Sequence, residues 1–475
     1  DHGSRPLMRA LRLVALVLIA SIIALGVVAE QDERPAPESV TVGGLGQPDA
    51  TTGTWFCPGG SGPGGRAAVA LEVINAGTEP AVADIVTVRS DPEPGRRSQV
   101  SVGAGERIGV AIADLAVDAA WIGAIVEVAG ADVIVEQTYD GLTGIDRAPC
   151  TTRTSQELFA TDGATRVIAE GEEMLLLLLN PFQEDAVVDI AFDADVGIDR
   201  LTAVVVPARR LAVIDVTQEV TVAGRVSARI EAVAGRVVGS RIQTRTGTAR
   251  GLTVTPLVQD GAAASVIPSV RTELGLTDRV LVTNPGEESA EVDLEILTDG
   301  SIEPDPVELT IRPGRTVEVV VAAESRLATI SEFAVLARSL TGDPVAVGIE
   351  RLAAMDPEIV PGTAAMPGIV GAAERWIAPL DGTSTQLVLV NPSMTAIART
   401  EVYLVGPDGR SLVTTIELGP GRRTTVSGDV LGERPIVVVE ASSAIVVGRE
   451  IVGLTSRQMM AAVAASELTP IAQLP

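Results

Sequence analysis

The segment Val280-Leu281-Val282-Thr283-Asn284-Pro285 decides the fold, because its pattern recurs four times along the chain. In each copy an apolar run ends at an asparagine, and the 475 residues contain only four asparagines. These are Asn75, Asn180, Asn284 and Asn391, which stand 105, 104 and 107 residues apart. An asparagine side chain bonds nearby backbone and tolerates left-handed conformations, so each marks the end of a strand and the start of a turn.

Three further landmarks keep phase with the asparagines. A second turn follows about 30 residues later, as in Pro313-Gly314 and Pro420-Gly421, and an arginine comes close behind it. Between the two turns lies a hairpin signal, Asp299-Gly300 in the third copy and Asp408-Gly409 in the fourth. An apolar strand such as 345–350 closes each copy. The chain therefore contains four tandem repeats.

The repeats read as β-structure. Apolar and polar residues alternate through 290–296, which is typical of a strand buried on one face. Six or seven such strands in each copy predict an immunoglobulin-type antiparallel sandwich. We expect an all-β chain with four such domains arranged as a rod. Their predicted ranges are 54–150, 151–250, 265–355 and 374–455, followed by a tail at 456–475 that packs back on the last domain or adds a strand to a partner.

The N-terminus carries a membrane signal. Residues 13–29 are apolar apart from Ser21 and Gly26, with arginines before them and acids after them. This predicts a cytoplasmic segment at 1–12, a single transmembrane signal anchor at 13–29 and an external linker at 30–53. A signal peptide that is cleaved after Val27-Val28-Ala29 is an alternative interpretation, and it would make the protein secreted. A buried helix is the third alternative.

Composition excludes several classes of function. The 62 acidic and 36 basic residues give a net charge of −26, which argues against nucleic-acid binding. The chain has no lysine, and its one histidine is His2. Serine and cysteine nucleophile systems that need imidazole, histidine zinc sites and P-loops are therefore not expected. We expect no catalytic residues and no cofactor.

Two cysteines, Cys57 and Cys150, flank the first repeat. In an oxidising compartment an even number of cysteines predicts a disulfide, here one that encloses the whole repeat. Two unpaired thiols and a redox pair are the alternatives.

Two acidic patterns in the sequence have features of binding or catalytic sites. Asp193, Asp195 and Asp199 have the spacing of a calcium loop, but Val204 stands where such a loop needs glutamate. A plain acidic turn is the simpler interpretation, so no metal is expected. Paired carboxylates could also support glycoside hydrolysis. The acids at 291, 293 and 295 instead alternate along one strand, as on a solvated sheet face.

The arginines after the second turns form a candidate anion-binding or partner-binding set. They are Arg107, Arg209, Arg315 and Arg422. In an up-and-down strand order they fall at equivalent ends of the domains, where a guanidinium can grip a carboxylate or phosphate in bidentate fashion. The alternative is that they seal junctions between domains.

Trp55-Phe56-Cys57-Pro58-Gly59 and Trp376-Ile377-Ala378-Pro379 open the first and fourth repeats. Each is followed by the strand-ending asparagine and the turn with arginine. The chain thereby resembles an actinobacterial family of membrane-anchored envelope proteins of unknown function, over about 54–454. The resemblance implies an N-terminal anchor, immunoglobulin-like repeats and genes near envelope glycosyltransferase genes; it implies no reaction.

These observations predict a non-enzymatic structural, scaffold or binding protein at the plasma membrane. Its expected partners are the membrane and another envelope protein or cell-wall glycan. The alternative function is an accessory subunit of a membrane enzyme that makes envelope glycan, such as a glycosyltransferase. A carboxylate hydrolase is the third class. Composition and spacing do not determine the oligomeric state.

Overall fold

The computed structural model describes residues 52–165, 171–194, 197–220, 224–300, 302, 304–353, 362–381, 385–432, 436–452 and 457–474, which all belong to one compact unit. This part of the chain is all-β, as the sequence predicts. The predicted transmembrane segment at 13–29 and its flanks at 1–12 and 30–51 lie outside it. No helix within the described ranges is long and apolar enough to cross a membrane.

The strands fall into four modules with the same order of elements. Module 1 contains β1 (Thr52–Ser61), β2 (Ala68–Asn75), β3 (Ala81–Arg89), β4 (Arg97–Val102), β5 (Arg107–Val110), α2 (Ile112–Leu115), β6 (Trp121–Ala129), β7 (Val133–Gly141) and β8 (Gly144–Pro149). Module 2 contains β9 (Glu157–Ala160), β10 (Ala164–Thr165), β11 (Glu173–Asn180), β12 (Ala186–Ala194), β13 (Gly197–Val206), β14 (Arg210–Asp215), α3 (Val216–Glu219), β15 (Gly224–Ala234), β16 (Val238–Arg245), β17 (Gly251–Pro256) and β18 (Val258–Gln259).

The second half repeats this order. Module 3 contains β19 (Ala264–Arg271), β20 (Leu276–Thr283), β21 (Ala290–Leu297), β22 (Val307–Ile311), β23 (Thr316–Val320), the 3-10 turns η1 (Val321–Ala323) and η2 (Ser325–Leu327), β24 (Glu332–Ser339), β25 (Ala346–Ala353) and β26 (Gly362–Pro367). Module 4 contains β27 (Gly371–Pro379), β28 (Thr385–Asn391), β29 (Ala398–Gly406), β30 (Gly409–Leu418), β31 (Arg422–Ser427), α4 (Gly428–Leu431), β32 (Ile436–Val452), β33 (Arg457–Ala461), β34 (Val463–Ala464), β35 (Thr469–Pro470) and η3 (Ile471–Gln473).

Each module has two sets of antiparallel strands, and in module 1 a parallel pairing of Ser61 with Ala68 joins the two sets into one sheet. In module 3 the sheets have the orders β19-β24-β21-β22 and β23-β20-β25-β26. The other modules repeat both orders, and the long strand β32 serves both sheets of module 4. The first strand thus pairs with the sixth and the second with the seventh, which differs from the ABED and CFG division of an immunoglobulin constant domain.

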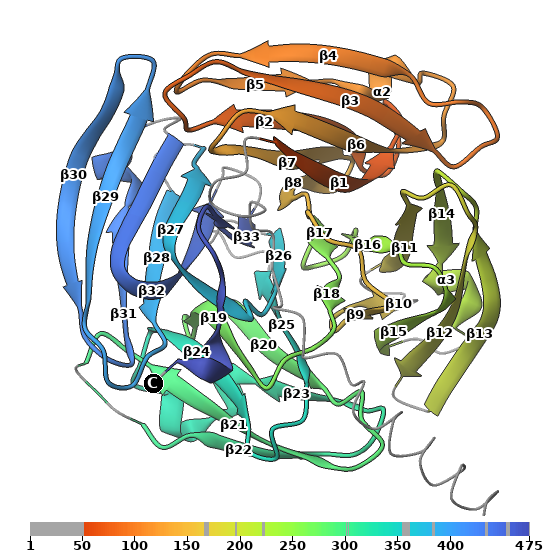
Figure 1. Cartoon of the computed structure of the whole chain (residues 1–475). Coiled ribbons are helices and arrows are strands. Elements are labelled where there is room, and N and C mark those ends of the chain that lie inside the picture. The colour runs from red at the N-terminus through yellow and green to blue at the C-terminus, as the bar shows by residue number, and fades with distance from the viewer. Residues whose placement is uncertain are drawn as a thin grey trace, which may run out of the picture. The chain divides into compact units, whose positions relative to one another are not determined.

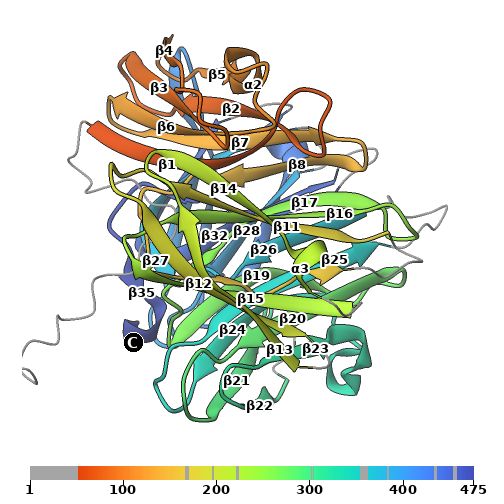
Figure 2. The ribbon, with the colours of Figure 1, turned by 90° about the vertical axis from the view of Figure 1, so that its right-hand side faces the viewer.

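The modules form a closed ring instead of the expected rod. Viewed along its centre, the ring has β4, β13, β22 and β30 at its outer edge (Figure 1). The last strands of the modules, β8, β17, β26 and β33, contact one another in cyclic order. They lie around the centre, and the turned view shows β17 and β26 inside the molecule (Figure 2). Ring closure removes free sheet ends from the centre, as radial packing does in a β-propeller.

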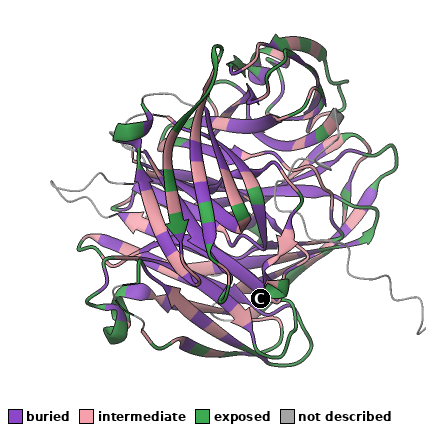
Figure 3. Cartoon of the chain, turned by 60° about the vertical axis from the view of Figure 1, so that its left-hand side comes forward, coloured by how far each residue is buried: buried purple, intermediate pink, exposed green. Residues whose placement is uncertain are grey.

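The segments that were expected to connect separate domains are strands or packed parts of the ring. The residues after 250 and after 355 contain β17 and β26, which are central strands. The C-terminal tail packs back on module 4, since β33 pairs with β32, while β34 and β35 pair with β27. The burial of residues agrees with the ring, because the inner strands are buried and the exposed residues lie mainly on the outer strands and loops (Figure 3).

Candidate functional site

The four asparagines have one shared structural role. Each is almost fully buried at the end of its strand. The Nδ2 of Asn284 donates to the carbonyls of Glu288 (2.7 Å) and Ile311 (2.9 Å), while its Oδ1 accepts from the Gly286 N–H at 2.8 Å. Asn75, Asn180 and Asn391 repeat all three bonds. Each side chain thus holds the turn that follows its strand, and it also bonds the carbonyl at the end of the fourth strand of its module, β4, β13, β22 or β30.

Replacing Asn180 by alanine should lower the free energy of unfolding by about 2–3 kcal/mol, because it leaves buried backbone groups without partners. The affected groups are the carbonyls of Glu184 and Val206 and the N–H of Phe182. Denaturant unfolding measures the loss, with the exposed Gln218 to alanine as a control that should change little. A loss below 0.5 kcal/mol would contradict this role.

Three of the candidate arginines, Arg107, Arg315 and Arg422, contact a neighbouring module, but Arg209 does not. In the second turn of each module one residue has a left-handed backbone conformation. It is Gly105, Gly314 or Gly421 in modules 1, 3 and 4, and Arg209 (φ 52°) in module 2. Counted from that residue, Arg315 and Arg422 stand one position later, as Arg210 does, while Arg107 stands two positions later. Sequence spacing alone did not reveal this offset. Arg209 itself is exposed, and its N–H donates to the Phe182 carbonyl at 2.9 Å.

Each of these turns reaches back to the preceding module. Arg210 donates to the Pro92 carbonyl of module 1 at 3.2 Å. Arg315 pairs with Asp193 of module 2 at 2.6 Å, and Arg422 lies against Gly300 of module 3. Arg107 contacts Asp381 of module 4 at 3.2 Å, which closes the cycle. The four contacts have one direction around the ring, as expected of head-to-tail interfaces that close.

The seam between modules 4 and 1 holds a buried charge network. Glu136 and Arg449 are both fully buried and pair with each other. Arg147 pairs with Glu136 at 3.1 Å, and also with Glu72 and Asp381. Burial disfavours the charge of Glu72, but hydrogen bonds from Arg107 and the charge of Arg147 lower its pKa to about 2. Glu72 is therefore ionised, and the network joins the first module to the last.

The seams 3/4 and 2/3 are built in the same way. Across seam 3/4, Arg351 contacts Asp278 of its own module and Glu450 of module 4, both at 2.6 Å. Across seam 2/3, Arg245 contacts Glu172 of its own module and Glu350 of module 3, both at 2.6 Å. Buried charges are stable only when paired and hydrogen-bonded, so these contacts fix the register of neighbouring modules.

Seam 1/2 is largely apolar, and module 4 packs against the same buried cluster of module 1. Leu175, Leu177 and Leu179 of β11 belong to the same buried cluster as the core of module 1. The other face of β11 packs inside module 2, which explains the unbroken leucine run. The buried polar contact here is Asp146, whose Oδ2 accepts from the Val254 N–H at 2.5 Å.

Asp146 makes this seam sensitive to pH. Burial raises the pKa of Asp146 to about 7, against the opposing effects of the N–H groups of Val254 and Arg147. A raised carboxyl pKa stabilises the fold when the group is protonated, so this contribution is lost as the pH rises through about 7. Asp146→Asn should therefore gain on the order of 2 kcal/mol over the natural protein at pH 8, with the difference shrinking toward pH 5. Unfolding curves at the two pH values test this, and a difference independent of pH would contradict it.

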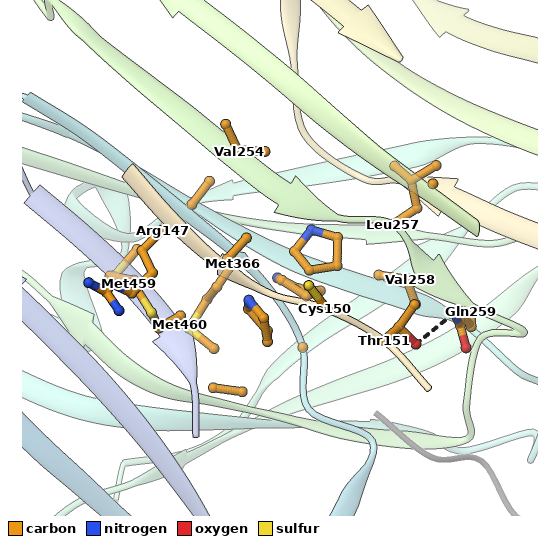
Figure 4. Close-up of a pocket in the computed structure, with 18 of the residues that line it drawn as sticks. Arg147, Cys150, Thr151, Val254, Leu257, Val258, Gln259, Met366, Met459 and Met460 are labelled. Atoms are coloured by element: carbon orange, nitrogen blue, oxygen red, sulfur yellow. Dashed lines mark hydrogen bonds between the residues drawn. The ribbon is translucent and has the colours of Figure 1, made fainter. Parts of the chain in front are cut away.

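The predicted disulfide is confirmed, since Cys57 and Cys150 are bonded. It joins β1 to the residue after β8, next to the centre of the ring. Cys150 also lines a central cavity of about 60 Å³, together with Met366, Met459 and Met460 (Figure 4). This volume has room for a few water molecules at most.

Asp193, the first residue of the possible calcium loop, is occupied by other contacts. The carboxylate of Asp193 pairs with Arg315 and accepts from the Thr316 N–H at 2.7 Å, so it serves seam 2/3. Asp195 lies outside the described residues, and Asp199 is exposed on β13. Across the described ranges no group of three histidine, cysteine, aspartate or glutamate residues is placed to hold a metal.

A groove of about 640 Å³ opens where modules 1 and 4 meet. We call it the 1/4 groove; its lining includes Asp114, Thr138, Asp140, Arg147, Asp381 and Gln458. Sequence reasoning missed it, because its walls come from opposite ends of the chain and meet only through ring closure.

Residues 216–468 match the model of a family described as "Family of unknown function (DUF5719)". The chain belongs to this family. The DUF5719 match runs from α3 through modules 3 and 4, so it covers just over half of the chain. Among curated proteins, none matches the chain. The expected membership of a family of unknown function is confirmed at this level.

Proposed function

We propose that this DUF5719 protein is a non-enzymatic scaffold or binding protein of the bacterial cell envelope, anchored by 13–29 with its ring outside the membrane. The observation that carries the proposal is ring closure by buried ion pairs. It gives a rigid body whose loops are presented in fixed positions around the outside. A rigid frame with surface loops suits the holding of a partner.

Two further features support the location. The Cys57–Cys150 bond is typical of an oxidising compartment, and the arginines before residue 13 favour an external C-terminal part. The resemblance of the opening aromatic motifs and the asparagine turns to actinobacterial envelope proteins favours the same compartment. Arg107 and Arg315 engage neighbouring modules, so the proposal assigns binding to other surfaces.

Fractionation of the native host in mild detergent tests the proposal. A scaffold or binding protein should be recovered with insoluble wall material or with an envelope partner. Recovery in fixed ratio with one polytopic membrane enzyme would support the accessory-subunit alternative instead. A chain found alone in the soluble fraction, with no wall material and no partner, would contradict the envelope role.

A further inference from the structure

Four residues other than glycine have a left-handed backbone conformation within the described ranges, namely Asp132, Ala203, Arg209 and Asp260. This conformation is unfavourable for a residue that carries a Cβ, so each case calls for a reason. Three cases have a reason within the fold. The carboxylates of Asp132 and Asp260 bond an arginine of module 4 and a serine hydroxyl of module 2. The N–H of Ala203 lies at a bulge of β13 and donates to Asp189 at 2.7 Å.

Arg209 is the exception, because its side chain contributes nothing to the fold. Its N–H donates to the carbonyl of Phe182 at 2.9 Å. In module 4 a glycine makes the same kind of bond without a side chain, from the N–H of Gly421 to the carbonyl of Ser393 at 2.8 Å. The guanidinium of Arg209 is exposed and has no hydrogen bond or ion pair within the described ranges. Glycine would be the less strained residue at this turn, so the arginine points to a contact outside the chain.

Phe182 is a second departure of module 2 from the repeat. It stands two positions after its strand-ending asparagine, where modules 1, 3 and 4 have Gly77, Gly286 and Ser393. The small residues of the other modules show that this turn needs no large side chain. Phe182 is nevertheless 44% exposed, and its carbonyl holds the turn of Arg209. An exposed phenylalanine at this place is therefore not explained by packing.

Arg236 lies on a neighbouring turn. This turn joins β15 to β16, and a Cβ placed on the adjacent Gly235 would be 3.0 Å from the Cβ of Ala186. Asp185, next to Ala186, accepts the N–H of Ala208 at 2.8 Å. The turns after β11, β13 and β15 therefore meet at one end of module 2. Arg236 is exposed and also lacks a bonding partner in the part of the chain that the structure describes.

We call Phe182, Arg209 and Arg236 the module 2 patch. Glu184 and Asp185 lie on the same turns, but among the described residues neither forms an ion pair with the two arginines. Both guanidinium groups thus stay available for carboxylates, which arginine binds in bidentate fashion. Aromatic residues and arginine are also the residue types that are enriched at the centres of protein interfaces.

We propose that the module 2 patch docks an acidic segment of a partner protein. Arg209 and Arg236 bind carboxylates of that segment, and Phe182 packs against an apolar side chain between them. The net charge of −26 repels an acidic partner from the rest of the surface, so a local pair of free arginines gives the contact its specificity. This inference deepens the binding role proposed above and rests on it.

Fluorescence anisotropy of labelled peptides, titrated with the detergent-solubilised full chain at physiological salt, tests the proposal. A peptide of alternating glutamate and leucine should bind, whereas its glutamine and leucine counterpart should not. Arg209→Gly should weaken binding about fivefold and should leave the melting temperature unchanged or higher, because glycine relieves the left-handed backbone. Arg236→Gln should also weaken binding about fivefold. Phe182→Ser, which introduces the residue of module 4, should weaken it too.

Arg312→Gln is the matched control, because it removes one exposed arginine from the second turn of module 3. An equal loss of affinity in this variant and in Arg209→Gly would show non-specific attraction and would overturn the proposal. Unchanged binding by Arg209→Gly, or equal binding of the two peptides, would also overturn it.

Polygalacturonate, a carboxylated glycan, is the third probe. Binding of this polymer without binding of the acidic peptide would assign the patch to a glycan and overturn the protein partner. Envelope fractionation is a separate readout, so recovery with wall material or a partner, without peptide binding, would refute the patch and leave the scaffold role standing.

Discussion

Replacing both Cys57 and Cys150 by alanine should lower the free energy of unfolding by about 4–5 kcal/mol. The two cysteines stand 93 residues apart in the sequence, so the bond closes a long loop and restricts the unfolded chain strongly. It also holds the first strand of module 1 beside the end of β8, and β8 contacts both β17 and β33 at the centre. Its loss should therefore loosen the seams on both sides of module 1.

Guanidinium unfolding of the natural and double-alanine proteins measures this effect. Addition of a reductant to the natural protein should reproduce it, while the double-alanine protein should not respond to reductant. A loss smaller than 1 kcal/mol would show that module 1 is held by its packing alone.

Replacing Arg351 by methionine should cost about 3–5 kcal/mol, because it leaves two buried carboxylates without their cation. Arg351 is fully buried, and its partners Asp278 and Glu450 are at most 3% exposed as side chains. The charges of these partners hold the pKa of Arg351 above its usual value despite burial. Glu450 would keep Arg271 at 3.2 Å, but Asp278 would lose its charged partner.

Arg326→Met is the matched control, since that arginine is 46% exposed and pairs with Glu324 at 3.5 Å. Exposed pairs contribute less than about 1 kcal/mol, so this variant should unfold almost as the natural protein does. A further variant that replaces Arg351, Asp278 and Glu450 together by apolar residues should recover much of the lost stability. Equal effects of Arg351→Met and Arg326→Met would contradict a role for buried charge at seam 3/4.

Local structure was largely predictable from the sequence. The four asparagines marked the strand ends, and the alternation at 290–296 placed Val292 and Leu294 in the core and Glu291 in solvent on β21. These features depend on neighbouring residues along one strand or turn. The disulfide was also predictable, because only one pairing of two cysteines exists.

Ring closure was not predictable in the same way, because it depends on the outer faces of the sheets. A signal was present in Leu175–Leu179, since a strand that is apolar at every position is buried on both faces. The charged pair Arg449-Glu450 within an apolar strand was a second signal, because such charges need partners from another module. In a rod of separate domains, the second apolar face of this strand and the buried charges would have no neighbouring module to contact. Neither feature alone identifies which modules meet.

Small-angle X-ray scattering of the chain from Val40 onward tests ring closure most directly. A compact body of this length has a radius of gyration of about 22 Å, whereas four separate modules in line give about 40 Å. We expect the lower value, unchanged on dilution. A radius near 40 Å would contradict the ring and restore the rod.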